Sequence, residues 1–112
     1  MAKAKRDNSK APTDPEKPVV MMFTDIQSST NLWAAAPEIM AGALEAHNAV
    51  LRDSIAANNG YEVKTVGDAF VVVFHSVDDA LAAGLAAQQA LFRLTWPGGT
   101  AIDSVYQELE SE

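Results

Sequence analysis

Hydrophobic residues along this chain follow two different periods, and the changes between them predict where strands and helices lie. Residues 19–23 form a compact apolar run, which is typical of a buried strand. Residues 61–66 alternate apolar and polar side chains, and residues 69–74 are continuously apolar. Gly67 and Asp68, between these two segments, are turn-forming residues. The pattern predicts one strand near the N-terminus and a β-hairpin farther along.

Helical periodicity fills the segment between the first strand and the hairpin. Residues 31–36 are predicted to form a short helix, with N-cap candidates at Ser28, Ser29 and Thr30. Residues 38–58 repeat apolar or large side chains every three or four positions, as an amphipathic helix does. The repeating positions are Met40, Leu44, His47, Leu51 and Ile55. This helix is expected to end at Asn58, Asn59 and Gly60, because Asn and Gly tolerate left-handed backbone geometry.

A second amphipathic helix is predicted to follow the hairpin. Ser76 and Asp79 have the spacing of a capping box, which marks a helix start. The residues predicted to face the core are Val77, Leu81, Leu85, Gln88, Leu91 and Phe92. The periodicity fades after Leu94, and residues 97–112 are predicted to be an acidic tail.

The order of these elements predicts the fold class. The order β-α-α-β-β-α is that of the first part of a ferredoxin-like or palm-type α/β (α+β) sandwich. In that arrangement the first strand lies antiparallel beside the third. The end of the first strand then adjoins the start of the third, so Asp25 and Asp68 are expected on one rim of the sheet.

Composition limits the classes of function. The chain has 112 residues, 48% hydrophobic and 21% charged, which indicates one soluble domain or part of one. It contains no Cys, so neither a disulfide nor a thiolate metal site is available. The longest apolar stretch, residues 69–74, is too short to cross a bilayer. The expected location is cytoplasmic.

Charge separates the ends of the chain from its body. Residues 1–17 carry five Lys or Arg and three acidic residues, and residues 18–112 carry three and twelve. We therefore expect a flexible basic lead-in at 1–17, a folded domain at 18–96 and the acidic tail at 97–112. The acidic body argues against nucleic acid as a partner, because non-specific affinity for phosphate backbones comes from clustered Lys and Arg.

Two short strings carry the candidate chemistry: FTDIQSST at residues 23–30 and EVKTVGD at residues 62–68. Each places a carboxylate, Asp25 or Asp68, where an apolar stretch meets a turn. Mg²⁺ prefers hard oxygen ligands, and phosphate favours exposed backbone N–H groups near a helix start. The pair predicts a metal-triphosphate site. Either Asp alone would more often be a simple turn or cap residue.

These strings together resemble the class III nucleotidyl cyclase catalytic domain. The surrounding residues, RDNSKAPTDP before and STNLWAAAPEIM after, look most like trypanosomatid receptor-type adenylate cyclases. The resemblance covers about residues 6–96 but only the first part of that family's domain. It implies that residues 18–96 are the N-terminal part of a nucleotidyl cyclase catalytic domain. It implies an enzyme that makes 3′,5′-cyclic AMP and pyrophosphate from ATP.

The resemblance also implies roles for particular residues. Asp25, the Ile26 backbone and Asp68 match the metal-binding positions for two Mg²⁺ or Mn²⁺ ions per site. Gln27, Ser28, Ser29 and Thr30 match the phosphate-binding turn, and Lys64 matches the lysine that selects adenine. Lysine offers only hydrogen-bond donors and adenine N1 is an acceptor, which favours ATP over GTP.

Partners follow from the same resemblance. The family's active site lies between two subunits, so a homodimer or a complementing cyclase chain is expected, with Lys64 serving the twin site. A membrane link, at the cytosolic face of the plasma membrane, would come only through an upstream segment of a parent protein. The family's later Asn and Arg are not in this sequence, so the chain alone is expected to turn over little ATP. The alternative is a non-catalytic metal-nucleotide-binding or dimerising fragment that regulates an intact cyclase.

Other conspicuous residues are expected to be structural. His47 lies on the apolar face of the first long helix, and His75 follows a strand. Neither has a partner at metal-ligand spacing. Trp33 and Trp96 are interpreted as packing anchors, and Met21 and Met22 as core residues.

Overall fold

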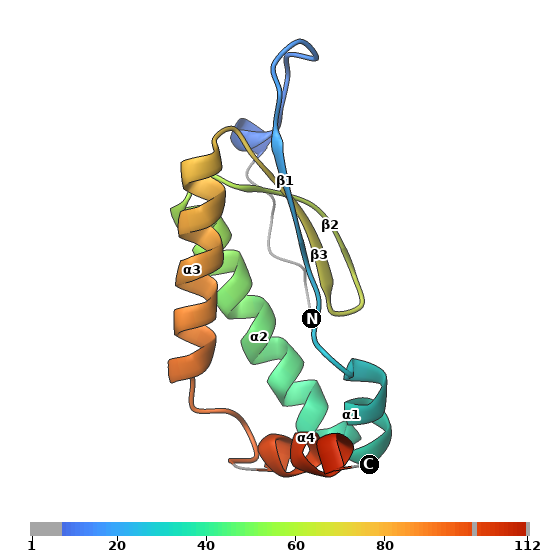
Figure 1. Ribbon diagram of the computed structural model, residues 1–112. Helices are drawn as coiled ribbons and strands as arrows, with labels where there is room; N and C mark the ends of the chain where they lie inside the picture. Colours follow the sequence, from blue (N-terminus) through green and yellow to red (C-terminus); the bar gives the residue numbers. More distant parts are fainter. Residues whose placement is uncertain (1–7, 100, 112) are drawn as a thin grey trace.

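The computed structural model of the chain describes residues 8–99 and 101–111 (Figure 1). Its elements are a 3₁₀ turn at Asn8–Lys10, β1 (Val20–Thr24), α1 (Ser29–Ala35), α2 (Pro37–Ala57), β2 (Tyr61–Val66), β3 (Ala69–Phe74), α3 (Val77–Arg93) and α4 (Ala101–Ser111). The predicted order β-α-α-β-β-α is confirmed from β1 to α3, and α4 adds a helix within the predicted acidic tail. None of the described helices is both long and apolar enough to span a bilayer.

A three-stranded antiparallel sheet in the order β1-β3-β2 organises the fold. The predicted antiparallel pairing of β1 with β3 is confirmed, and Thr24 at the end of β1 lies opposite Phe70 at the start of β3. Gly67 has φ +60, as the hairpin turn between β2 and β3 requires. The register between β2 and β3 shifts between Glu62 and Lys64, which marks a β-bulge.

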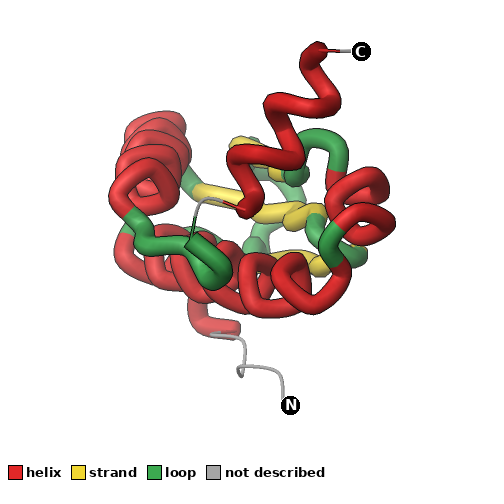
Figure 2. The backbone as a smooth tube through the Cα atoms, turned by 90° about the horizontal axis from the view of Figure 1, so that it is seen from below, coloured by secondary structure: helices red, strands yellow, loops and turns green. Residues whose placement is uncertain are grey.

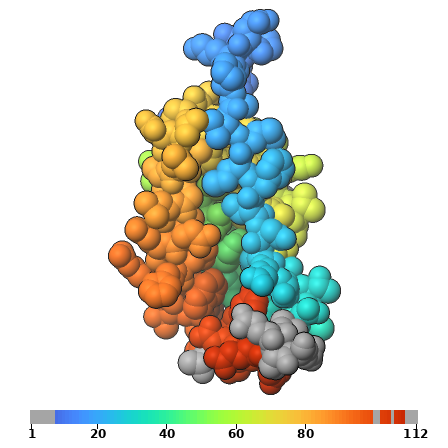
Figure 3. Space-filling view, viewed as in Figure 1, coloured from blue at the N-terminus to red at the C-terminus, as the bar shows by residue number. Residues whose placement is uncertain are grey.

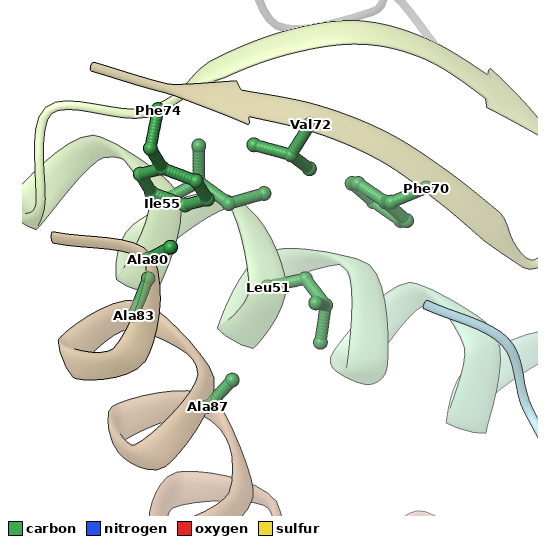
Figure 4. Close-up of a cluster of buried hydrophobic side chains, with 8 residues drawn as sticks. All are labelled: Leu51, Ile55, Phe70, Val72, Phe74, Ala80, Ala83 and Ala87. Atoms are coloured by element: carbon green, nitrogen blue, oxygen red, sulfur yellow. The ribbon is translucent and has the colours of Figure 1, made fainter. Parts of the chain in front are cut away.

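The main core lies between one face of the sheet and the helices α2 and α3 (Figure 4). Phe70, Val72 and Phe74 alternate along β3 and are fully buried. They pack against Leu51 and Ile55 of α2. Burying each such side chain contributes about 1.5–3 kcal/mol, so β3 is the strand that holds the sheet to the helices.

The helix α3 contacts this core through alanines, and the predicted core face of this helix is wrong. Ala80, Ala83 and Ala87 are buried. Five of the six predicted core residues are exposed, namely Val77, Leu81, Leu85, Gln88 and Phe92, whereas Leu91 packs against the core. Small side chains let α3 lie close to the sheet, whereas periodicity counted only the large apolar residues.

The strand β1 is only half buried, which corrects the expectation of a fully buried strand. Its side chains alternate between partly buried and exposed. Met21 and Phe23 are 54% and 69% exposed, so Met21 is not a core residue. Met22, on the other face, packs against the main core as expected.

A second, smaller cluster joins α1, α2 and α4. Leu32, Met40, Ala43 and Ile102 are buried in it, with Trp96 packed against them. The interpretation of Trp96 as a packing residue is confirmed, but Trp33 is 39% exposed and is not an anchor. Viewed from this end, α4 crosses in front of the sheet (Figure 2).

Asn59 and Gly60 end the helix α2, and each is required there for a different physical reason. Asn59 takes the left-handed conformation at φ 62, and the Gly60 N–H donates to the Ile55 carbonyl over 2.9 Å. This is the Schellman arrangement. Glycine is required at position 60 because there is no room for a side chain. A Cβ there would lie 2.6 Å from Phe74 Cε1 and 2.8 Å from Ile55 Cγ2.

Gly60→Ala is expected to lower the free energy of unfolding by about 1–3 kcal/mol, since the added methyl overpacks Phe74. Gly84→Ala is the matched control, because Met22 Sδ, its nearest neighbour, would be 3.9 Å away. In the α3 interior this control should raise stability by about 0.5–1 kcal/mol. Urea unfolding followed by circular dichroism measures the stability of both variants. Equal free energies of unfolding for the two variants would contradict the close approach of Gly60 to Phe74.

The alanine face of α3 gives a second test. Ala83→Leu should destabilise the chain by about 1–3 kcal/mol, because Ala83 is 1% exposed and the site has no room. Leu81→Gln should change stability by no more than about 0.5 kcal/mol, as for an ordinary surface position. The same unfolding experiment measures both variants. A larger loss for Leu81→Gln would mean that the leucine face is the packed one.

Candidate functional site

The candidate site lies where β1 ends and the β2–β3 hairpin turns. Asp25 follows β1 directly, and Asp68 closes the hairpin just before β3. Because β1 and β3 are antiparallel neighbours, these two positions share one rim of the sheet. The Ile26 backbone N–H donates to Asp68 Oδ2 over 2.9 Å, which ties the two turns together. The predicted convergence of the two acidic residues is therefore present in the fold.

Asp68 is the better-connected carboxylate of the pair. Burial opposes its ionisation, but hydrogen bonds with the Ile26 N–H, the Asp25 side chain, its own backbone and the Ser29 side chain outweigh burial. Together they hold the pKa of Asp68 below its ordinary value of 3.8. Asp68 is thus ionised at neutral pH, with Asp25 within hydrogen-bonding reach.

The segment after Asp25 is a strained turn and not the capped helix start that the sequence predicted. Ser28 adopts the left-handed conformation, with φ 59 and ψ 31, and its side chain makes no capping hydrogen bond. The first helical hydrogen bond runs from the Leu32 N–H to the Ser28 carbonyl over 3.0 Å. The hydroxyl of Ser29 faces Asp68 instead. A non-glycine residue in this conformation costs about 1–2 kcal/mol, which other contacts must offset.

The other predicted phosphate-binding positions lie at the surface of this turn. Gln27 and Thr30 are exposed, and Ser28 and Ser29 are partly buried. Gln27 and Asp25 line one end of a cavity of about 400 Å³ that extends between α2, α3 and α4. The sequence prediction missed Tyr106 of α4, which also lines this cavity and whose hydroxyl donates to the Gln27 carbonyl over 2.8 Å. The acidic composition of this segment hid the helix, although Ile102 and Tyr106 have helical spacing.

Lys64 lies apart from the carboxylates. It is exposed on the edge strand β2, opposite Val71 of β3. Within residues 8–99 and 101–111, no ion pair of 4.0 Å or less joins Lys64 to Asp25 or Asp68. The neighbouring part of β2 is fixed to α2 by an ion pair of 3.0 Å between Arg52 Nε and Glu62 Oε1. The chain thus brings the two carboxylates together, and in its described part Lys64 is exposed on β2 without an ion pair to either of them.

Among the described residues, neither histidine is hydrogen-bonded to Asp25 or Asp68, although His47 lines the same cavity as Asp25. His47 is 5% exposed, bonds to Asn48 Oδ1 over 2.9 Å and meets the edge of the Phe70 ring, so its interpretation as a packed residue is confirmed. His75 Nε2 contacts the Lys10 carbonyl over 2.9 Å at the far end of β3. Among the described residues, no group of three or more His, Cys, Asp and Glu is gathered for a metal.

Comparison with known proteins finds relatives whose sequences match nearly the whole of this chain. Receptor-type adenylate cyclase B of Leishmania donovani is 42% identical over 105 residues, covering 94% of this chain and 8% of the relative. Receptor-type adenylate cyclase GRESAG 4.3 of Trypanosoma brucei brucei is 42% identical over 107 residues, covering 96% of this chain and 9% of the relative. The chain therefore spans a small part of the curated relatives it matches.

Solved structures match over the same extent. Two structures of adenylate cyclases from Trypanosoma brucei, described as being in their monomeric state, superpose with TM-scores of 0.89 and 0.90 at 41% and 42% identity. Each alignment covers 94% of this chain, and 44% and 45% of the solved chains respectively. Residues 11–96 match the family described as the adenylate and guanylate cyclase catalytic domain. The chain belongs to the adenylate and guanylate cyclase catalytic domain family.

Proposed function

We propose that this chain is the N-terminal part of an adenylate cyclase catalytic domain, which makes 3′,5′-cyclic AMP and pyrophosphate from ATP once the domain is completed. The observation that carries the proposal is the hydrogen bond from the Ile26 N–H to Asp68 Oδ2, which sets two carboxylates side by side at one rim. The family membership and the relatives' names support the same activity.

The residues at this rim fit divalent cations. Asp25 and Asp68 supply carboxylate oxygens and Ile26 a backbone carbonyl, and these hard ligands suit Mg²⁺ or Mn²⁺. Two adjacent carboxylates with Asp68 ionised also form a locally negative site that a cation would neutralise. The ATP phosphates would supply further ligands, which agrees with a site of only two acidic side chains.

Each residue then has a defined task in the reaction. Two bound ions would activate the ribose 3′-hydroxyl and neutralise the triphosphate charge. Asp25 and Asp68 would hold those ions, and Asp68 also keeps the Ile26 peptide in place. The backbone N–H groups of residues 27–30 would bind the phosphates. Lys64 would donate to adenine N1 and so favour ATP over GTP.

The position of Lys64 supports an active site shared between two chains. Lys64 pairs with Val71, and Val71 pairs with Phe23, so the three share the sheet face opposite the helices. That face is apolar and open, with Met21, Phe23 and Val66 54%, 69% and 61% exposed. A second copy packed on this face would bury these side chains and present its Lys64 to the first chain's carboxylates. We therefore propose a homodimer.

A groove beside β1 supports the need for a complementing segment. It has a volume of about 400 Å³ and runs between β1 and α3, with α2 as its floor (Figure 3). Within the part of the chain that the structure describes, β1 pairs with β3 alone. A strand from the rest of a cyclase domain would satisfy this open edge. We also propose that the assembled domain works at the cytosolic face of the plasma membrane, in a receptor-type parent like the relatives.

The first test of this function is metal-dependent nucleotide binding. Calorimetry should detect ATP binding to the chain with Mn²⁺ and not with EDTA. Asp25→Asn should weaken binding at least about tenfold, because it removes one charged ligand. Asp53→Asn, an exposed substitution on α2, is the control and should bind like the wild type. Identical heats for the wild type and Asp25→Asn would contradict the proposed site.

The second test is reconstituted activity. Adding the remaining part of a relative's catalytic domain should yield cyclic AMP from ATP, whereas the chain alone should yield little. Asp25→Asn and Lys64→Ala should each abolish activity, and a mixture of the two should recover part of it, because a mixed dimer has one intact site. Formation of a dimer without any product would favour the non-catalytic binding fragment. Activity retained by Lys64→Ala would exclude its role in adenine binding.

A further inference from the structure

The contact between α4 and the turn after β1 links residues 79 positions apart in sequence. Tyr106 of α4 donates its hydroxyl hydrogen to the Gln27 carbonyl over 2.8 Å. Burial and the nearby negative charge of Asp68 both raise the pKa of Tyr106 above its ordinary value of 10.0. The hydroxyl therefore stays protonated, and remains a donor, at neutral pH.

Packing fixes the place from which Tyr106 makes this hydrogen bond. Ile102, one helical turn before Tyr106, is 9% exposed and is buried against Leu32 of α1 and Met40 of α2. The Tyr106 ring packs against the same cluster. The hydroxyl is thus presented by a side chain that is itself anchored, so the hydrogen bond costs less side-chain entropy than one from a freely rotating surface group.

The turn that receives the hydrogen bond needs support. Residues 25–28 run from the end of β1 into the left-handed Ser28. The Ile26 N–H is held by Asp68 on one side, and the Gln27 carbonyl is held by Tyr106 on the other. The Gln27 carbonyl belongs to the peptide group that leads directly into Ser28. Strained backbone persists only where neighbouring groups over-determine it, and these two hydrogen bonds do so here.

We propose that Tyr106 is a positioning residue for the metal-nucleotide site, acting through the Gln27 peptide. This inference rests on the proposed function, because the turn carries Asp25 and the N–H groups assigned to the phosphates. By engaging the Gln27 carbonyl, Tyr106 fixes the orientation of the peptide group that also carries the Ser28 N–H, one of the N–H groups assigned to the phosphates. Without its hydroxyl, the turn would sample other conformations and the site would have to be ordered by the ligand itself.

Tyr106→Phe tests the inference, because phenylalanine keeps the ring and removes only the hydroxyl. Tyr61→Phe is the matched control, which removes a hydroxyl from β2 away from the turn. Both are compared with the wild-type full chain in three measurements. These are the thermal unfolding midpoint, the NMR order parameters of residues 26–28 together with the Gln27 carbonyl shift, and ATP affinity with Mn²⁺ by calorimetry.

In Tyr106→Phe, the Gln27 carbonyl resonance should move and the order parameters should fall from the rigid value of about 0.85. Affinity for ATP with Mn²⁺ should drop about three- to tenfold, as expected for the loss of one net hydrogen bond. Tyr61→Phe should leave both unchanged, and the unfolding midpoints of the two variants should be similar. If Tyr106→Phe lowered the unfolding midpoint together with the ATP affinity, Tyr106 would have a purely structural role and the inference would be overturned.

The remaining outcomes separate this inference from the function on which it rests. Unchanged order parameters in Tyr106→Phe would overturn the positioning role whether or not the chain binds nucleotide. Altered order parameters with unchanged or tighter ATP binding would also overturn it, since the tyrosine would then be irrelevant or would obstruct the site. Absence of ATP binding by the wild-type chain would instead refute the proposed function, and with it any role of Tyr106 toward a nucleotide.

Discussion

The antiparallel pairing of β1 with β3 is the constraint on which the candidate site depends. It places the end of one strand beside the start of the other, so that turns 42 residues apart meet through the Ile26 N–H and Asp68 Oδ2. The pairing is secured from the opposite face, where Phe70, Val72 and Phe74 are buried against α2 and α3. The core thus fixes the spacing of the two acidic side chains at the rim.

Helices of this chain cover only one face of the same sheet. Its inner face is covered by α2 and α3, while the outer face exposes Met21, Phe23 and Val66, and the groove beside β1 remains open. A chain that matches less than half of the solved cyclase chains would have such surfaces where the rest of the domain and a partner pack. Large exposed apolar areas usually mark interaction sites. In the proposed homodimer, the outer face and Lys64 would meet the second copy.

The buried face of α3 was a part of the fold that periodicity did not predict, although it did predict the buried face of α2. The spacing of large residues assigned Val77, Leu81 and Leu85 to the core, yet α3 packs through Ala80, Ala83 and Ala87. Both stripes have helical spacing, because a three-to-four repeat occurs on more than one face of an alanine-rich helix. Which stripe turns inward depends on how closely the helix approaches the sheet. That distance depends on β3 and α2, which are remote in sequence, and not on the local pattern.

The sequence by itself determined the order of the elements from β1 to α3, the hairpin at Gly67 and the convergence of Asp25 with Asp68. The hairpin follows from a local pattern, and the pairing of β1 with β3 follows from the order of the elements. The resemblance in its motifs supplied the chemistry proposed for them. Only the tertiary structure decided that Ser28 stands at the helix start in a strained left-handed conformation without a side-chain cap, and that Tyr106 reaches back to Gln27. Both depend on side chains and peptide groups brought together by packing between distant segments, and no local spacing of residues encodes such a contact.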